Sequence, residues 1–127
     1  MDFFISSLFM YRFAFPLLLL LYISYLPLDV LEIDAAQYAS IAREMNERGD
    51  YLQIYHRGED YLDKPPLLFW LASLSFSLLG VSAWAYKLPA FLALLLALTS
   101  TYRFAKLWYS TQTARLAALL LGTSQAF

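Results

Sequence analysis

The stretch LPAFLALLLALTSTY, residues 88–102, decides the fold class, because it contains no charged residue and is followed by Arg103 and Lys106. With its flank it covers residues 88–107, about 20 residues, which a helix needs to cross the hydrocarbon core of a bilayer. The whole chain has the same character, since 61% of its 127 residues are apolar and 15% are charged. Soluble domains carry roughly 25% charged residues. The composition, with a mean hydropathy of +0.53, therefore predicts an all-α membrane protein.

Two further apolar segments, residues 12–28 and residues 114–127, are predicted to be transmembrane helices. The first has one basic residue before it, Arg12, and no small-x-small cleavage pattern after it. We therefore expect a retained helix rather than a cleaved signal peptide. The second segment begins a span that no polar tail closes, so the chain is expected to be the N-terminal part of a polytopic protein.

The charged residues are unevenly distributed. Nine of the ten acids lie between Asp29 and Asp63, whereas the segment 103–115 holds three basic residues and no acid. By the positive-inside rule, the N-terminus and the segment 103–115 face the cytoplasm, and residues 29–87 form an extracytoplasmic loop. The net charge of −1 argues against nucleic acid as a partner, because it leaves no basic surface to neutralise phosphates.

Within this loop, residues 34–48 are predicted to form a helix at the membrane interface. Its polar face is charged, and its apolar face repeats at helical spacing through Tyr38, Ile41, Ala42 and Met45. Asp34 and Gln37 form a capping-box pattern at the start, which predicts Asp34 as the N-cap. Gly49 suits the left-handed position that ends a helix.

Residues 66–80 are predicted to form a second interfacial helix, which begins at Pro66 and ends at Gly80. A crossing here and another at residues 88–107 would place the basic segment 103–115 outside, against the charge rule. Turn signals at Gly49-Asp50 and Gly58 predict a short hairpin between the two helices. The loop aromatics are expected to form an interfacial belt made of Tyr51, Tyr55, Tyr61, Phe69, Trp70 and Trp84.

Two polar positions have a defined place at this interface. Asp34 is either only a helix cap or also a catalytic carboxylate at the boundary between water and lipid. Lys64 is stiffened by the two prolines that follow it. With Asp63 beside it, Lys64 is either a snorkelling anchor or a cation that waits for a lipid-linked phosphate. The Tyr61 hydroxyl is close enough in sequence to reach the same ligand.

The sequence predicts neither a cofactor nor a metal site. His56 is the only histidine, and the chain has no cysteine, so no metal-ligand spacing such as HxxxH occurs. We expect His56 to be a solvated loop histidine. A divalent metal is left open, without support from these residues.

Three motifs carry a resemblance to a known family: EIDAAQYASIAREM (residues 32–45), YLDKPPLLFWLASLSFSLLG (residues 61–80) and AYKLPAFLALLLAL (residues 85–98). They resemble the N-terminal part of bacterial dolichyl-phosphate-mannose–protein mannosyltransferases and of the related 4-amino-4-deoxy-L-arabinose lipid A transferases. The resemblance implies a polytopic GT-C-type fold in the bacterial inner membrane, with its active face outside. It also implies inverting transfer of a sugar from a polyprenyl-phosphate-linked donor to a lipid, glycan or protein acceptor.

The resemblance assigns roles to residues of these motifs. Asp34 matches the family's catalytic carboxylate in the first loop, and Lys64 matches the lysine near the donor phosphate. Tyr38 and Tyr61 match tyrosines in the same motifs, and Asp63 is a supporting residue beside Lys64. Without the remaining spans of the family, this chain alone is expected to have no transferase activity.

Two positions depart from the common motif, because Ala35 and Gln37 stand where it has glutamate and arginine. The departure leaves the acceptor open. A second hypothesis, from a different class, is a non-catalytic membrane module that binds lipid or acts as a scaffold. In that case Asp34 would be only a cap, and Asp63 and Lys64 would be anchors.

Overall fold

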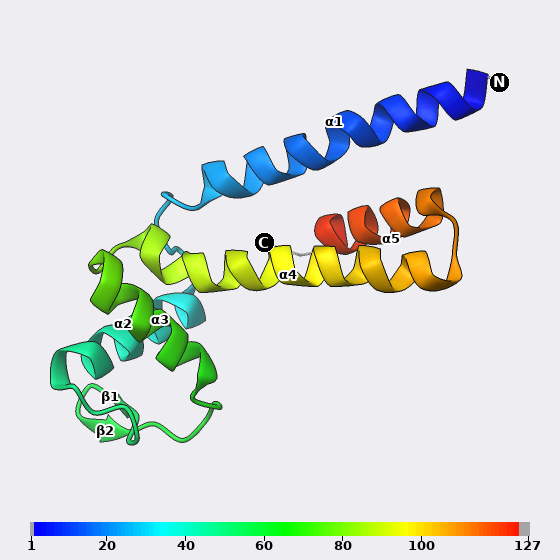
Figure 1. The fold of residues 1–127 in the computed structure, drawn as a ribbon. Helices are drawn as coiled ribbons and strands as arrows, with labels where there is room; N and C mark the ends of the chain where they lie inside the picture. Colours follow the sequence, from blue (N-terminus) through cyan, green and yellow to red (C-terminus); the bar gives the residue numbers. More distant parts are fainter. Residues whose placement is uncertain (1, 125–127) are drawn as a thin grey trace. The chain divides into compact units, whose positions relative to one another are not determined.

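The computed structural model describes the backbone of residues 2–124 and the side chains of residues 13–124. Its elements are α1 (Asp2–Tyr25), α2 (Ile33–Arg48), β1 (Tyr55–His56), β2 (Glu59–Asp60), α3 (Leu67–Leu79), α4 (Ala83–Trp108) and α5 (Thr111–Ser124) (Figure 1). The predicted helical class is confirmed. The short hairpin that the turn signals predicted is also present, as an antiparallel pair in which His56 faces Glu59.

The chain divides into two compact units. One unit comprises α1, α5 and the part of α4 from Phe91 onward, and the other runs from Leu26 to Ala90. The second unit contains every candidate site residue that the sequence analysis named. Residues 125–127, the end of the predicted third span, lie outside the described residues.

The unit of α1, α4 and α5 is held by an apolar cluster and one buried polar contact. Tyr22 packs with Leu94 and Leu98, and its hydroxyl donates a hydrogen bond to the carbonyl of Gly122 at 2.6 Å. Gly122 permits this approach, because a Cβ there would lie 2.5 Å from Cδ2 of Leu18. A glycine at this position of α5 thus allows α1 to pack closely against it.

Among the described residues, α4 is the one helix long and apolar enough to cross a membrane. Its 26 residues extend about 39 Å. The apolar part of α1, Phe13–Tyr25, and the helix α3, Leu67–Leu79, are shorter. At about 20 Å, α3 falls short of the roughly 30 Å hydrocarbon core, which favours the predicted position along the interface.

α4 begins at Ala83, earlier than the predicted residue 88, and continues through Pro89. Proline has no N–H, so the carbonyl of Ala85, four residues earlier, loses its helical partner. The hydroxyl of Ser75 on α3 donates a hydrogen bond of 2.5 Å to that carbonyl. A side chain of a neighbouring helix therefore replaces the bond that proline removes, and the helix extends without an unsatisfied buried acceptor.

The Leu26–Ala90 unit has its core between α2, α3 and the hairpin (Figure 1). The predicted apolar face of α2 is buried through Ile41, Ala42 and Met45, with Tyr38 packed at its margin. Phe69 lies at the centre of this core and is fully buried. The prediction that Phe69 belongs to an aromatic belt is therefore wrong: at the third position of α3 it points toward α2, whereas its neighbour Trp70 is exposed.

The start of α2 differs from the prediction. The N-cap is Glu32, whose carboxylate Oε2 accepts the N–H of Ala35 at 2.7 Å. Asp34 lies inside the first turn instead, so its predicted capping role is wrong. The capping-box pattern predicted the wrong residue because short side chains are favoured at the N-cap. Here the longer side chain of Glu32 reaches the free N–H of Ala35 instead. Gly49 ends the helix in the left-handed conformation, with φ +70°, as predicted.

The start of α3 follows the expected use of proline. Pro66 directly precedes Leu67 with φ −74° and ψ −16°, already helical values. Its carbonyl accepts the N–H of Trp70 at 3.0 Å. Proline fits here because its fixed φ suits a helix and no partner is required for a missing N–H. Lys64 is therefore separated from the first residue of α3 by two prolines, Pro65 and the N-cap Pro66.

Replacing Phe69 by alanine is expected to destabilise this unit by about 3–5 kcal/mol, the usual cost of emptying a buried phenylalanine site. The measurement is the thermal-unfolding midpoint of the purified full-length protein. Leu78→Ala is the matched control, because Leu78 lies on the same helix and is 74% exposed. Equal shifts for the two variants would contradict the central position of Phe69.

Candidate functional site

The candidate site is formed by two segments of the Leu26–Ala90 unit. The first turns of α2 provide Asp34 and Tyr38, which are four residues apart and so lie on one helix face. The segment after the hairpin provides Tyr61 and Asp63. Its backbone is fixed by the N–H of Tyr61, which donates to the carbonyl of Ile54 at 2.8 Å.

Phe69 links the two segments through ring contacts. The Tyr61 ring meets Phe69 edge to face, with centroids 5.9 Å apart and an interplanar angle of 86°. Tyr38 meets the same ring with centroids 5.8 Å apart at 71°. Such edge-to-face pairs are favoured arrangements, so the buried Phe69 fixes the position of both tyrosines.

The polar groups of the site converge on the Tyr61 hydroxyl. Desolvation raises its pKa above the ordinary value, and nearby Tyr38 and the negative charges of Asp63 and Asp34 act in the same direction. The polar Tyr38 side chain nearby also favours the protonated phenol. Tyr38, Asp34 and Asp63 are thus close enough to Tyr61 to affect its pKa, and Tyr61 remains a hydrogen-bond donor at neutral pH.

The charged groups of this site are not neutralised by one another. In residues 13–124, the ion pairs within 4.0 Å are Arg43–Glu47 at 3.4 Å and Arg48–Glu44 at 2.7 Å. Neither pair includes the exposed residues Asp34, Asp63 or Lys64. Lys64 is therefore the fifth predicted residue, next to the cluster in sequence, with its ammonium available to an external anion.

His56 differs from its predicted environment. It belongs to β1 and is half-buried, and its ring meets Tyr61 edge to face with centroids 6.3 Å apart. Its Nδ1 is covered, with no hydrogen-bond partner among the described residues. The prediction of a solvated loop histidine is thus wrong, because the hairpin folds the ring against Tyr61.

No group of three or more metal-ligating side chains occurs in the part of the chain that the structure describes. Asp34 and Asp63 lie near the same phenol, but a metal site needs more ligands than these two carboxylates provide. The structure therefore adds no support for a divalent metal.

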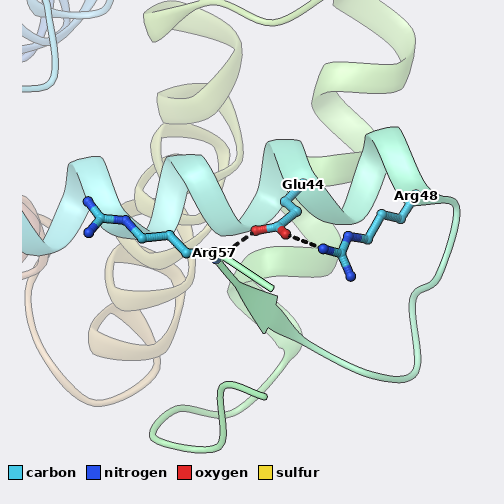
Figure 2. A network of polar contacts seen from close by, with 3 residues as sticks. All are labelled: Glu44, Arg48 and Arg57. Atoms are coloured by element: carbon cyan, nitrogen blue, oxygen red, sulfur yellow. Dashed lines mark hydrogen bonds and ion pairs between the residues drawn. The ribbon is translucent and has the colours of Figure 1, made fainter. Parts of the chain in front are cut away.

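Sequence reasoning missed a polar network on the outer side of α2 (Figure 2). One carboxylate oxygen of Glu44 accepts the backbone N–H of Arg57 at 3.0 Å, and the other pairs with Arg48 at 2.7 Å. Arg57 has φ +56°, the one positive φ outside glycine among the described residues. That conformation costs about 1–2 kcal/mol for a residue with a side chain. Gly58 signalled a turn here, but nothing in the sequence indicated the strain at Arg57.

Comparison with known proteins shows the family to which these motifs point. Residues 63–127 match the family model described as dolichyl-phosphate-mannose-protein mannosyltransferase. The matched range includes Asp63 and Lys64, whereas Asp34, Tyr38 and Tyr61 precede it.

Two similar relatives carry the name undecaprenyl phosphate-alpha-4-amino-4-deoxy-L-arabinose arabinosyl transferase. The one from Pectobacterium carotovorum is 35% identical over 92 residues, which cover 72% of this chain and 16% of that protein. The one from Yersinia pestis is 32% identical over 88 residues, which cover 68% of this chain and 16% of that protein. The chain thus spans about a sixth of the length of these relatives.

A solved structure shares the fold. The crystal structure of ArnT from Cupriavidus metallidurans in the apo state superposes with a TM-score of 0.72 at 25% identity, over 83% of this chain and 20% of that one. The shared region is large enough to include most of both compact units.

Proposed function

The chain belongs to the dolichyl-phosphate-mannose-protein mannosyltransferase family, and on this premise we propose that the whole protein is a multi-pass, inverting glycosyltransferase of the bacterial inner membrane. Its donor is a sugar linked to a polyprenyl phosphate, and its acceptor is a lipid, glycan or protein on the extracytoplasmic side. The names of the relatives support undecaprenyl phosphate as the carrier. The 127 residues alone lack transferase activity in this proposal.

The observation that carries the proposal is the position of Asp34. It lies in the first turn of α2 and is exposed, while Glu32 serves as the cap. Its negative charge acts on the Tyr61 hydroxyl, together with that of Asp63. A carboxylate that is not needed as a cap, beside an oriented phenol, is suited to general-base work at the interface.

The reaction follows from these groups. The acceptor hydroxyl or phosphate oxygen attacks the anomeric carbon of the donor sugar, and Asp34 accepts the acceptor's proton or orients its oxygen. The bond between the anomeric carbon and the phosphate oxygen breaks, and its electron pair leaves on the polyprenyl phosphate. Lys64 stabilises the growing negative charge, and the Tyr61 hydroxyl donates to the same phosphate. A single displacement of this kind inverts the anomeric configuration.

The roles of the remaining residues are positional. Tyr38 helps to position Tyr61, because both rings pack edge to face against Phe69. Asp63 adds negative charge next to Lys64 in sequence, without an ion pair between them. Pro65 and Pro66 restrict the backbone at Lys64, so less conformational entropy is lost when Lys64 is positioned at the donor phosphate in each turnover.

The proposal is tested with the full-length protein in proteoliposomes that contain an undecaprenyl-phosphate-linked sugar and a crude envelope fraction as acceptor. We expect release of undecaprenyl phosphate that depends on the acceptor and a product of inverted anomeric configuration. Failure with every lipid-linked sugar, at normal expression and folding, would instead favour the non-catalytic membrane module.

Replacing Tyr61 by phenylalanine is expected to lower the transfer rate by about 10- to 10²-fold, since a hydrogen bond to a charged group contributes roughly 1.5–3 kcal/mol. The ring contact with Phe69 is retained, so the thermal-unfolding midpoint should not change measurably. Tyr51→Phe is the control, because Tyr51 is 44% exposed and contacts Trp70 through its backbone carbonyl. Equal rates for the two variants would exclude a role for the Tyr61 hydroxyl.

A further inference from the structure

An open pocket of about 530 Å³ lies beside the N-terminal half of α2, and its lining includes His56, whose ring also contacts Tyr61. Its polar lining comes from Gln37, Ser40, His56 and Arg57, and its apolar lining includes Leu31 and Ile33. These two apolar side chains are 90% and 83% exposed. The pocket therefore combines the guanidinium of Arg57 and further polar side chains with apolar side chains that are exposed to solvent.

Arg57 is held in place by its backbone rather than by its side chain. Its N–H donates to Glu44, and this contact fixes a left-handed conformation that only glycine adopts without cost. Figure 2 shows the guanidinium pointing away from Glu44. The structure thus keeps a strained residue in a position that brings its side chain to the pocket.

The charge of this guanidinium is not neutralised within the described part of the chain. Glu44 is the nearest acid in the network, but its two oxygens are taken by the Arg57 N–H and by Arg48. None of the ion pairs among residues 13–124 includes Arg57. An arginine with five N–H donors, fixed beside amide and hydroxyl donors, has the geometry for a phosphate oxygen pair.

We propose that this pocket binds the phosphate of an anionic lipid headgroup, with Arg57 as the principal ligand and Gln37 and Ser40 as further donors. Leu31 and Ile33 contact the glycerol or the upper acyl chain. The site is lined by none of the five predicted site residues, and it takes no part in sugar transfer. It fixes the depth of the Leu26–Ala90 unit at the membrane surface, where an anionic headgroup meets a cation close to exposed apolar side chains.

The test measures binding to the delipidated, full-length protein by native mass spectrometry. The probes are dihexanoyl phosphatidylglycerol, dihexanoyl phosphatidylcholine and inorganic phosphate. Arg57→Gly is the decisive variant, because glycine tolerates φ +56° and the fold is not placed at risk. It is expected to weaken phosphatidylglycerol binding by about tenfold, whereas Arg57→Lys should bind more tightly than Arg57→Gly but less tightly than the wild type, since lysine binds phosphate only as a point charge.

Arg43→Gln is the matched control, because Arg43 lies on the same helix and its charge is paired with Glu47. It should bind phosphatidylglycerol as the wild type does. Competition by inorganic phosphate would identify the phosphate alone as the ligand, and its failure to compete would show that the lipid body contributes; both results support the site. Unchanged binding by Arg57→Gly, or an equal loss in Arg43→Gln, would overturn it whether or not the protein transfers sugar.

Discussion

Replacing Asp34 by asparagine in the full-length protein is expected to lower the rate of sugar transfer by about 10²–10⁴-fold, the usual contribution of a general base. Asparagine keeps the size of the side chain but accepts no proton. The helix should stay intact, because its cap is the carboxylate of Glu32. The measurement is the single-turnover rate with bound lipid-linked sugar, which separates the chemical step from donor binding.

Glu32→Gln is the control for this experiment. It retains a side-chain oxygen for the Ala35 N–H and changes the same amount of charge two residues away. Its transfer rate should stay within about twofold of the wild type, since the loss of one helix-end charge alters stability by only about 0.3–1 kcal/mol. A wild-type rate for Asp34→Asn would remove the catalytic carboxylate from the account.

Replacing Lys64 by alanine is expected to lower the transfer rate by about 10²–10³-fold, as for other groups that stabilise charge as it develops. In contrast to Asp34→Asn, this variant should also bind undecaprenyl phosphate more weakly, because the cation contacts the phosphate in both the ground state and the transition state. The measurement pairs the single-turnover rate with the dissociation constant for undecaprenyl phosphate.

Lys106→Ala is the matched control, because Lys106 is exposed and lies in the last turn of α4. Lys106→Ala also removes one positive charge, but at a position far in sequence from the candidate site. It should change neither the single-turnover rate nor the dissociation constant for undecaprenyl phosphate. If Lys64→Ala bound the carrier as tightly as Lys106→Ala does, Lys64 would be an anchor and not a phosphate ligand.

The helices were predictable because their signals are local. The apolar repeat of α2, the glycine at its end and the proline before α3 each depend on neighbours within one or two turns. The cap of α2 was not predictable, since Glu32 is disfavoured by general preference and succeeds only in this loop conformation. The early start of α4 was not predictable either, because it depends on Ser75 of α3, whose hydroxyl donates to the Ala85 carbonyl that Pro89 leaves without a helical partner.

The roles of the site residues stay a prediction, and their arrangement was not predictable from the sequence. The motifs pointed to Asp34, Tyr38, Tyr61 and Asp63, yet their meeting point depends on Phe69, which composition alone places in an aromatic belt. The ring is buried because α2 and α3 pack against each other, a contact between segments distant in sequence. The conformation of Arg57 was not predictable for a related reason, since its φ of +56° is fixed by a contact with Glu44, which belongs to a different element.

The most direct test of the shared donor site is the protection of residues 34 and 64 by the carrier lipid. Single cysteines replace Asp34, Lys64 or the control Arg43 in a full-length background free of other cysteines, and proteoliposomes are treated with a membrane-impermeant maleimide. We predict that all three react from the extracytoplasmic side, and that undecaprenyl phosphate slows labelling at positions 34 and 64 but not at position 43. Labelling of 34 and 64 from opposite faces, or protection of only one of them, would contradict a single donor held between these two residues.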